Sequence, residues 1–351
     1  MLEKTKKAFV ELGKFLAQFK ESEIVKGSDV LNNDLFFNDF LLLIENQKHH
    51  NGWFIESEVY FSIQSWAKAL TPENLDKWLL PYNISGKSPK TIGLILAGNV
   101  PLVGFHDFLS VLITGHKALV KTSSNDKQLL VFLAEYLIQV EPSLKNRIEF
   151  TDGQLKKFDA VIATGSNNTA RYFEYYFKDK PSIIRKNRNS VAVLNGTETH
   201  EDLVRLGKDI FTYFGLGCRS VSKLFVPKDY DFEKLFQAMY EYREIINYQK
   251  YINNYDYNKA VFLMSNFLIL DNGFLILKED TSYSSPIAAV FYENYSDMEE
   301  IKNRLHQDNK LIQCAVSNNL IENSVAFGQT QFPKLWDYAD NVDTIKFLNS
   351  I

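Results

Sequence analysis

The most constraining feature of this sequence is an alternation of short β-rich runs with helical runs, which begins at Thr91. Strands that alternate with helices favour a mostly parallel sheet covered by helices on both faces. We therefore predict an α/β fold with a doubly wound sheet, the class that binds dinucleotides. The β-rich runs are TIGLIL (91–96), KALVKT (117–122), RIEF (147–150), DAVIAT (159–164) and SVAVLN (190–195), with helices expected at about 101–113, 127–140 and 169–177.

The chain is long enough for two domains, since it has 351 residues of which 45% are hydrophobic. Aromatic-rich helical runs precede the connector LPYNISGKSPK at 80–90, and a second α/β pattern with an Asn272-Gly273 hairpin turn follows the first. The predicted division is a helical N-terminal region at 1–88, a dinucleotide-binding domain at 89–195, a second α/β domain at 196–325 and a C-terminal tail at 326–351.

Charge and composition exclude several classes of protein. The net charge is −4, and the 39 basic and 43 acidic residues are mixed along the chain, so no nucleic-acid partner is expected. The N-terminus lacks the apolar centre of a signal peptide, and the apolar segment 91–115 is interrupted by Asn99, Pro101 and Asp107, so no membrane span is predicted. Two cysteines and six histidines show no zinc-ligand spacing. We expect a cytoplasmic, metal-free protein.

The stretch FGLGCRSVSKLFVP, residues 214–227, places Cys218 at a turn between a helix and a strand. Gly215 and Gly217 allow close approach of a substrate, and Arg219 adds positive charge, which are conditions for a reactive thiolate. A cysteine in a loop is also commonly structural, so the residues alone leave both readings open. Cys314 lies inside an alternating strand and is read as a core residue.

Polar residues follow three of the predicted strands at the edge where open α/β sheets bind ligands. Asn99 is read either as an oxyanion donor or as a helix N-cap. Lys121, with Ser123 and Ser124 after it, suits a ribose or phosphate but also suits a solvated turn.

In ATGSNNTARYF, Gly165 and Ser166 precede a helix whose N-terminal N–H groups suit a diphosphate. The run lacks the full Rossmann glycine fingerprint, so this signal is weak by itself.

The order of these motifs is more specific than any one of them. Asn-x-Pro at 99–101, Gly-x5-Lys at 115–121, Thr-Gly-Ser at 164–166 and Gly-x-Gly-Cys at 215–218 together resemble the aldehyde dehydrogenase superfamily. The chain most resembles the acyl-CoA reductase family, typified by the fatty-acid reductase subunit of bacterial luminescence. The resemblance covers roughly residues 90–330, and the tail AFGQTQFPKLWDYADNVDTIKFL is also similar to tails of that family.

This resemblance implies a nicotinamide dinucleotide cofactor and a covalent acyl-cysteine intermediate. It makes Cys218 the nucleophile, and it makes Asn99 with the Cys218 N–H an oxyanion hole. The cofactor-binding positions that it implies are Lys121, Ser123 and Ser124 at the adenosine ribose and Gly165 and Ser166 at the diphosphate.

Three departures from the wider superfamily refine the expectation. Aldehyde-oxidising members activate water with a glutamate, whereas PSIIRKNRNSVAVLNG at 181–196 contains no carboxylate, which favours acyl-CoA chemistry. Ser124 stands where many NAD-preferring members have a glutamate, so NADPH is expected over NADH, although NADH is possible. Ser282 stands in place of a ribose-binding glutamate, and Arg185, Lys186 and Arg188 are a basic cluster that suits either CoA phosphates or a solvated turn.

We therefore predict an acyl-CoA reductase that forms a fatty aldehyde from a long-chain acyl-CoA or a carrier-bound acyl thioester. The alternatives are an acyl-phosphate reductase or an aldehyde dehydrogenase of the same superfamily, or a relative that transfers or binds acyl groups without redox turnover. By the same resemblance, an acyl-activating synthetase is a possible partner.

Overall fold

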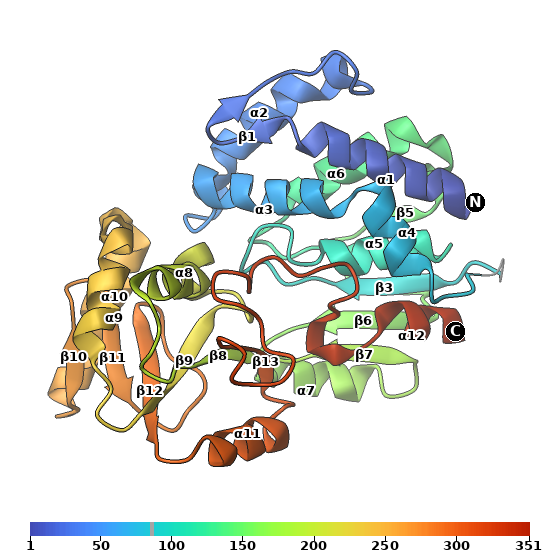
Figure 1. Ribbon diagram of the computed structural model, residues 1–351. Helices are drawn as coiled ribbons and strands as arrows, with labels where there is room; N and C mark the ends of the chain where they lie inside the picture. Colours follow the sequence, from blue (N-terminus) through green and yellow to red (C-terminus); the bar gives the residue numbers. More distant parts are fainter. Residues whose placement is uncertain (85–87) are drawn as a thin grey trace. The chain divides into compact units, whose positions relative to one another are not determined.

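The structure is a computed structural model that describes residues 1–84 and 88–351 (Figure 1). Residues 85–87, inside the predicted connector, lie outside the described residues. The chain forms two compact units. Unit 1 comprises Met1–Lys186 and Lys334–Ile351, and unit 2 comprises Asn187–Pro333.

Among the described residues, unit 1 contains a five-stranded sheet with the strand order β5-β4-β3-β6-β7. All four pairings in this order are parallel. Figure 1 shows β3, β6 and β7 running side by side. Because β4 and β6 lie on opposite sides of β3, the winding reverses at β3, as in doubly wound folds. The strands are β3 (Thr91–Ile95), β4 (Lys117–Lys121), β5 (Ile148–Phe150), β6 (Ala160–Thr164) and β7 (Ser182–Arg185).

The helices of unit 1 pack their apolar sides into one core. Phe15 stacks on Tyr136 with ring centroids 4.4 Å apart, and Phe9 and Phe105 meet edge to face. Much of the aromatic content of the chain is therefore core. The remaining elements are α1 (Leu2–Leu16), β1 (Phe19–Lys20), β2 (Glu23–Ile24), α2 (Asn33–His50), α3 (Glu56–Ala69), α4 (Pro72–Leu79), α5 (Phe105–Ile113), α6 (Gln128–Val140), the 3₁₀ turns η1 (Pro142–Asn146) and η4 (Ala339–Asn341), α7 (Asn167–Tyr176) and α12 (Thr344–Ser350).

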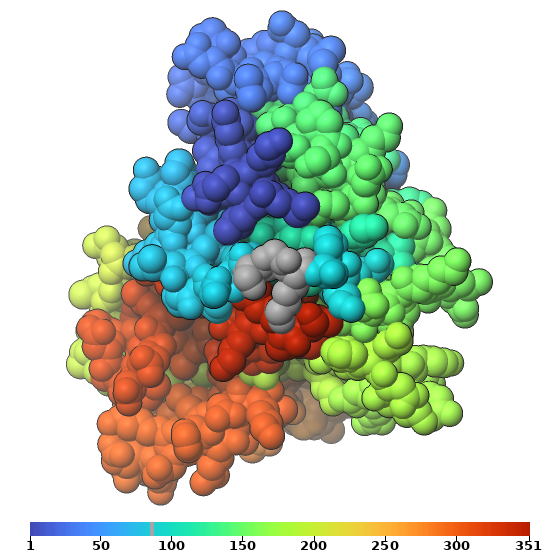
Figure 2. Space-filling view, turned by 90° about the vertical axis from the view of Figure 1, so that its right-hand side faces the viewer, coloured from blue at the N-terminus to red at the C-terminus, as the bar shows by residue number. Residues whose placement is uncertain are grey.

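The C-terminal residues belong to unit 1. The Trp78 indole N–H donates to the Tyr338 hydroxyl at 2.7 Å, and the Lys77 ammonium lies over the Trp336 ring. Figure 2 shows the red C-terminal residues at the surface beside light-blue residues of the N-terminal helical region. Residues 334–351 of the predicted tail are thus fixed to helix α4, whereas residues 326–333 belong to unit 2.

Within the described part of unit 2, a six-stranded sheet has the order β10-β11-β12-β9-β8-β13. Only the β10–β11 pairing of this sheet is antiparallel, and it is the hairpin predicted at Asn272-Gly273. The elements are β8 (Asn189–Val193), α8 (His200–Phe211), η2 (Thr212–Gly215), β9 (Val221–Pro227), α9 (Phe232–Met239), η3 (Tyr240–Asn247), α10 (Gln249–Met264), β10 (Ile269–Asp271), β11 (Ile276–Glu279), β12 (Ala289–Tyr295), α11 (Met298–Gln307) and β13 (Ile312–Val316).

Two expected elements differ from the structure. The helix predicted from residue 101 begins at Phe105, because Leu102 has a left-handed φ of 59° that interrupts a helix. The strand run 190–195, predicted in the first domain, is β8 and pairs with β9 and β13 in unit 2. The fifth strand of the first sheet is β7, which was not predicted as a strand.

No helix of the described residues is long and apolar enough to cross a membrane. The same residues contain no group of three or more His, Cys, Asp or Glu side chains placed to bind a metal ion.

Candidate active site

In unit 1, the predicted cofactor residues lie at one edge of the sheet. Asn99 follows β3, Lys121 ends β4, and Gly165 follows β6. Because these strands are parallel, their carboxyl ends lie at the same edge. The edge includes the point beside β3 where the winding reverses, which is where open α/β sheets bind ligands. The topology therefore brings these predicted residues to one side of unit 1.

The loop after β3 exposes Asn99 and packs against the loop after β4. A Cβ at Gly98 would lie 2.6 Å from the Ser123 hydroxyl oxygen, so only glycine fits this approach. The Ser62 hydroxyl donates to the Pro101 carbonyl oxygen at 2.8 Å. Helix α5 has its N-cap at Gly104, so the reading of Asn99 as the cap of this helix is wrong. Asn99 is an exposed amide on a loop that these neighbouring residues hold in place.

A buried carboxylate, Asp126, also supports this loop. Its Oδ2 accepts the Leu102 N–H at 2.7 Å, which holds the left-handed residue in place. Its Oδ1 has no hydrogen-bond partner among the described residues. Burial raises the pKa of Asp126 to about 7, whereas the Leu102 N–H opposes the shift. Asp126 could not be recognised from the sequence, because nothing in its pattern distinguishes it from a solvated aspartate.

The two predicted ribose serines have different surroundings. The Ser123 hydroxyl accepts the Asn125 N–H at 3.2 Å and packs against Gly98, so it shapes its own loop. Ser124 is exposed, and Lys121 is partly exposed beside it. Of the two serines, Ser124 is therefore the more exposed.

Gly165 and Ser166 form the turn before α7, as predicted. The Ser166 hydroxyl accepts the Thr169 N–H at 3.3 Å, which makes Ser166 the N-cap of the helix. A Cβ at Gly165 would lie 3.0 Å from Thr169 and Phe173 side-chain atoms, so glycine permits the chain to turn tightly from β6 into α7. The N-terminus of α7 thus lies at the same sheet edge as Asn99.

The basic cluster does not form a CoA-phosphate site of three exposed cations. Arg185 is buried and binds both carboxylate oxygens of Asp107, at 2.7 and 3.3 Å. Lys186 pairs with Glu174 at 2.7 Å. Arg185 was misread because a short charged run predicts solvent exposure, whereas the fold encloses its first member.

In unit 2, Cys218 is exposed at the turn before β9, as predicted. The Gly217 carbonyl accepts the Ser220 N–H at 3.0 Å, and the Cys218 carbonyl accepts the Ser190 hydroxyl at 3.0 Å. The peptide units on both sides of Cys218 are therefore anchored. An exposed thiol on a fixed backbone is the arrangement that a nucleophile needs.

The segment 328–331 holds this turn in place through hydrogen bonds. The buried Asp209 carboxylate accepts the Gly328 N–H at 2.6 Å, and it accepts both the N–H and the hydroxyl of Thr330. Arg219 donates to the Thr330 carbonyl oxygen, and the Gln331 amide donates to the Ser220 hydroxyl at 3.3 Å. Asp209 was not identified from the sequence, whereas the family-like tail AFGQTQF was the signal for its partners.

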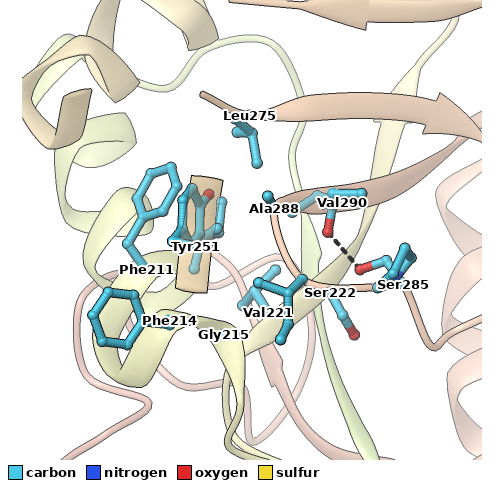
Figure 3. Close-up of a pocket in the computed structure, with 14 residues that line it drawn as sticks. Phe211, Phe214, Gly215, Val221, Ser222, Tyr251, Leu275, Ser285, Ala288 and Val290 are labelled. Carbon is cyan, nitrogen blue, oxygen red and sulfur yellow. Dashed lines mark hydrogen bonds between the residues drawn. The ribbon is translucent and has the colours of Figure 1, made fainter. Parts of the chain in front are cut away.

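Strained backbone and a small pocket lie beside the turn. Tyr213, Phe214 and Gly215 have consecutive left-handed φ values of 54°, 55° and 75°, and such strain is concentrated at functional sites. Figure 3 shows the rings of Phe214 and Tyr251 on one side of the pocket and Val221 on another. Its volume of about 30 Å³ takes one or two water-sized groups and not a long aliphatic chain.

The fold defined by these units is that of the aldehyde dehydrogenases. The chain is similar to the aldehyde dehydrogenase KauB from Pseudomonas aeruginosa, with 12% identity and a TM-score of 0.62 over 90% of this chain and 72% of that chain. A protein from Anabaena variabilis described as an aldehyde dehydrogenase, PutA, has 15% identity and a TM-score of 0.60 over 90% and 78%. An NAD⁺ complex of an aldehyde dehydrogenase from Bacillus cereus has 13% identity and a TM-score of 0.60 over 89% and 71%. The predicted fold class is confirmed.

The family is shown by the sequence. Residues 71–247, just over half of the 351, match the family described as Acyl-CoA reductase (LuxC). The chain belongs to this family, and the predicted resemblance is confirmed. A search of the curated proteins found no match. The family and the fold together identify the chain as an oxidoreductase, and the matched span contains all the predicted site residues.

Proposed function

We propose that this protein reduces the acyl group of an acyl-CoA, long-chain donors included, or of a carrier-bound thioester, to an aldehyde through an acyl-Cys218 intermediate. The observation that carries the proposal is the exposed thiol on an anchored turn, inside the span that matches the acyl-CoA reductase family. The segment 181–196 has no carboxylate to activate water, and the Asp209 carboxylate is occupied by Gly328 and Thr330. Hydrolysis of the acyl-enzyme is disfavoured without a general base.

The chemistry begins at sulfur. The Cys218 thiolate attacks the thioester carbonyl, and Asn99 together with the Cys218 N–H stabilises the oxyanion. The C–S bond to CoA then breaks, and CoA leaves as its thiolate. After reduction, the thiohemiacetal on Cys218 breaks its own C–S bond, which releases the aldehyde and returns the Cys218 thiolate.

The edge of the unit 1 sheet fits a nicotinamide dinucleotide. Lys121 and Ser124 would hold the adenosine ribose, with Ser123 shaping their loop, and Gly165 and Ser166 at the start of α7 would hold the diphosphate. Such a cofactor, when bound, supplies hydride. The NAD⁺-bound Bacillus cereus structure of the same fold supports this assignment.

We assign NADPH as the preferred cofactor, with NADH as the alternative. Ser124 brings no negative charge that would repel a 2′-phosphate, and it is exposed at the sheet edge. On this proposal, unit 1, with residues 89–186 of the predicted first domain, serves cofactor binding, and unit 2 carries the nucleophile. An acyl-activating synthetase is the partner class that would supply the acyl donor.

A single-turnover experiment tests the proposal. Pure protein and a Cys218→Ala variant are incubated with a radiolabelled long-chain acyl-CoA, and NADPH is then added. We expect label on the wild type only, and we expect it to leave as aldehyde. Replacement of the nucleophile should reduce turnover by on the order of 10⁴-fold or more.

Other outcomes identify the alternatives. Label that responds to neither NADPH nor NADH would indicate acyl transfer without redox turnover. Aldehyde formed only from an acyl phosphate, or acid formed from a free aldehyde, would assign the protein to other chemistry of the superfamily. No Cys218-dependent label from any donor would contradict the proposal.

A further inference from the structure

Ser190 lies between the only two cysteines of the chain. It is completely buried near the start of β8, with β9 on one side and β13 on the other. Its hydroxyl is 3.0 Å from the Cys218 carbonyl oxygen and 3.0 Å from the Cys314 sulfur. One hydroxyl therefore connects a residue of the β13 strand with the backbone of the proposed nucleophile.

The sheet is irregular at this point on both sides. Along β13 and β8, Ile312 pairs with Asn189 and Ala315 with Val191, so Gln313 and Cys314 together face Ser190. A second register shift separates β8 from β9 immediately after Ser190. Irregularities of this kind are uncommon in parallel pairings, and they re-aim side chains near active sites. Here the first one directs Cys314 to Ser190.

The direction of the hydrogen bonds follows from the proton count. A serine hydroxyl has one proton, and that proton is donated to the Cys218 carbonyl. The contact with sulfur must then use the Cys314 S–H as donor and the Ser190 oxygen as acceptor. Burial raises the pKa of Cys314, which keeps the thiol protonated. The charged groups that act on Cys314 are Arg219 and Asp209, and both are bound to the segment 328–331.

We infer that Ser190 and Cys314 are positioning residues, which orient the Cys218 thiol through a chain of hydrogen bonds from Cys314 to Ser190 to the Cys218 carbonyl. The inference rests on the proposed role of Cys218. Each bond polarises the next, so the chain restrains the Cys218 peptide more firmly than Ser190 alone would. Without it, the thiol samples orientations from which attack is slower.

Two rates on Cys218 test the inference. The first is alkylation by iodoacetamide, in which the Cys218 sulfur bonds to carbon and iodide leaves. The second is single-turnover acylation by an acyl-CoA. Ser190→Ala should slow both rates about tenfold, with the KM for acyl-CoA changed by less than about twofold. Cys314→Ala should slow both about threefold, whereas Cys314→Ser, which keeps a donor of similar size, should stay within about twofold of the wild type.

A matched control is Ser317→Ala, which removes another buried serine hydroxyl beside β13, one that donates to Ser324 at 2.7 Å. This variant should leave both rates unchanged, and thermal unfolding of every variant establishes that it is folded. Equal rates for Cys314→Ala and Cys314→Ser, or wild-type rates for Ser190→Ala, would overturn the inference. If no acyl-CoA labels Cys218, the proposed function fails, whereas the alkylation rates still decide the positioning role.

Discussion

The carboxyl edge of the unit 1 sheet and the Cys218 turn of unit 2 are built in different ways. At the edge, the hydroxyls of Ser166 and Ser123 bond within their own loops, to the N–H groups of Thr169 and Asn125. The edge combines these local bonds with bonds between more distant segments, such as that from Ser62 to Pro101, 39 residues apart. At the turn, the bonds made by the side chains of Asp209 and Ser220 reach across 121 and 111 residues.

This difference matches what each region is proposed to do. A cofactor-binding edge needs exposed groups at the ends of strands, and the topology of a parallel sheet supplies them. A nucleophile needs one fixed orientation, which requires contacts from several directions. We therefore expect substitutions of the groups that anchor the Cys218 turn to affect both stability and acylation. Substitutions of exposed groups at the carboxyl edge of the unit 1 sheet should affect function with little loss of stability.

The largest effect is expected for Asp209→Ala in unit 2. The change leaves three buried donors of Gly328 and Thr330 without an acceptor, which should lower the free energy of unfolding by about 4 kcal/mol. Urea unfolding measures this loss of stability. Asp231→Ala is the control, because that carboxylate caps α9 through a local bond to Glu233 and should cost only about 1 kcal/mol. Similar losses for both variants would contradict the comparison.

Asp126→Asn examines a buried group of unit 1 that bonds to a residue of another loop. Because the pKa of Asp126 rises from 3.8 to about 7 on folding, the folded protein binds a proton that the unfolded chain has released. The contribution of Asp126 to the free energy of unfolding therefore falls as pH rises, by about 3 kcal/mol between about pH 4.5 and about pH 7.

Urea unfolding at several pH values would measure this dependence. The free energy of unfolding of the wild type minus that of Asp126→Asn should decrease across that pH range, since the asparagine of the variant does not titrate there. Asp152→Asn, at an exposed carboxylate of unit 1, should keep the wild-type slope. A wild-type slope in Asp126→Asn would show that Asp126 has an ordinary pKa.

Asn99→Ala tests the edge for function. If the amide stabilises the oxyanion, kcat should fall roughly 100-fold, which is about 2.7 kcal/mol, with little change in KM or in unfolding. Steady-state kinetics with acyl-CoA and NADPH measure this. Asn46→Ala, at an exposed amide of α2 that donates to the Leu42 carbonyl, is the control. A rise in KM with unchanged kcat would assign Asn99 to binding instead.

The smallest effect is expected for Ser124→Glu. A carboxylate at this exposed position should repel the 2′-phosphate and shift the ratio of the NADPH and NADH dissociation constants by about tenfold towards NADH, which is about 1.4 kcal/mol. Fluorescence titration with both cofactors measures the ratio. Ser124→Gln adds the same bulk without charge and should leave the ratio near the wild-type value. An unchanged ratio in both variants would remove Ser124 from the cofactor site.

The sheet class, the order of the motifs and the family could all be predicted from the amino-acid sequence. These rest on short-range properties: hydrophobic runs that suit buried parallel strands, glycines where the chain turns closely, and a serine that caps the helix following it. The hairpin at Asn272-Gly273 and the Gly165-Ser166 turn before α7 were predictable for the same reason.

The identity of the buried polar groups and of their partners depends instead on how the chain packs in three dimensions. Residues 101–104 are not helical because Asp126, from another loop, fixes Leu102 in a left-handed conformation. Arg185 is buried against Asp107, which lies 78 residues earlier in the chain. Ser190 contacts both the Cys218 carbonyl and the Cys314 sulfur, and Cys314 lies 124 residues after Ser190. The physical reason is that desolvation and hydrogen bonding depend on neighbours in space, and local periodicity carries no information about neighbours a hundred residues away.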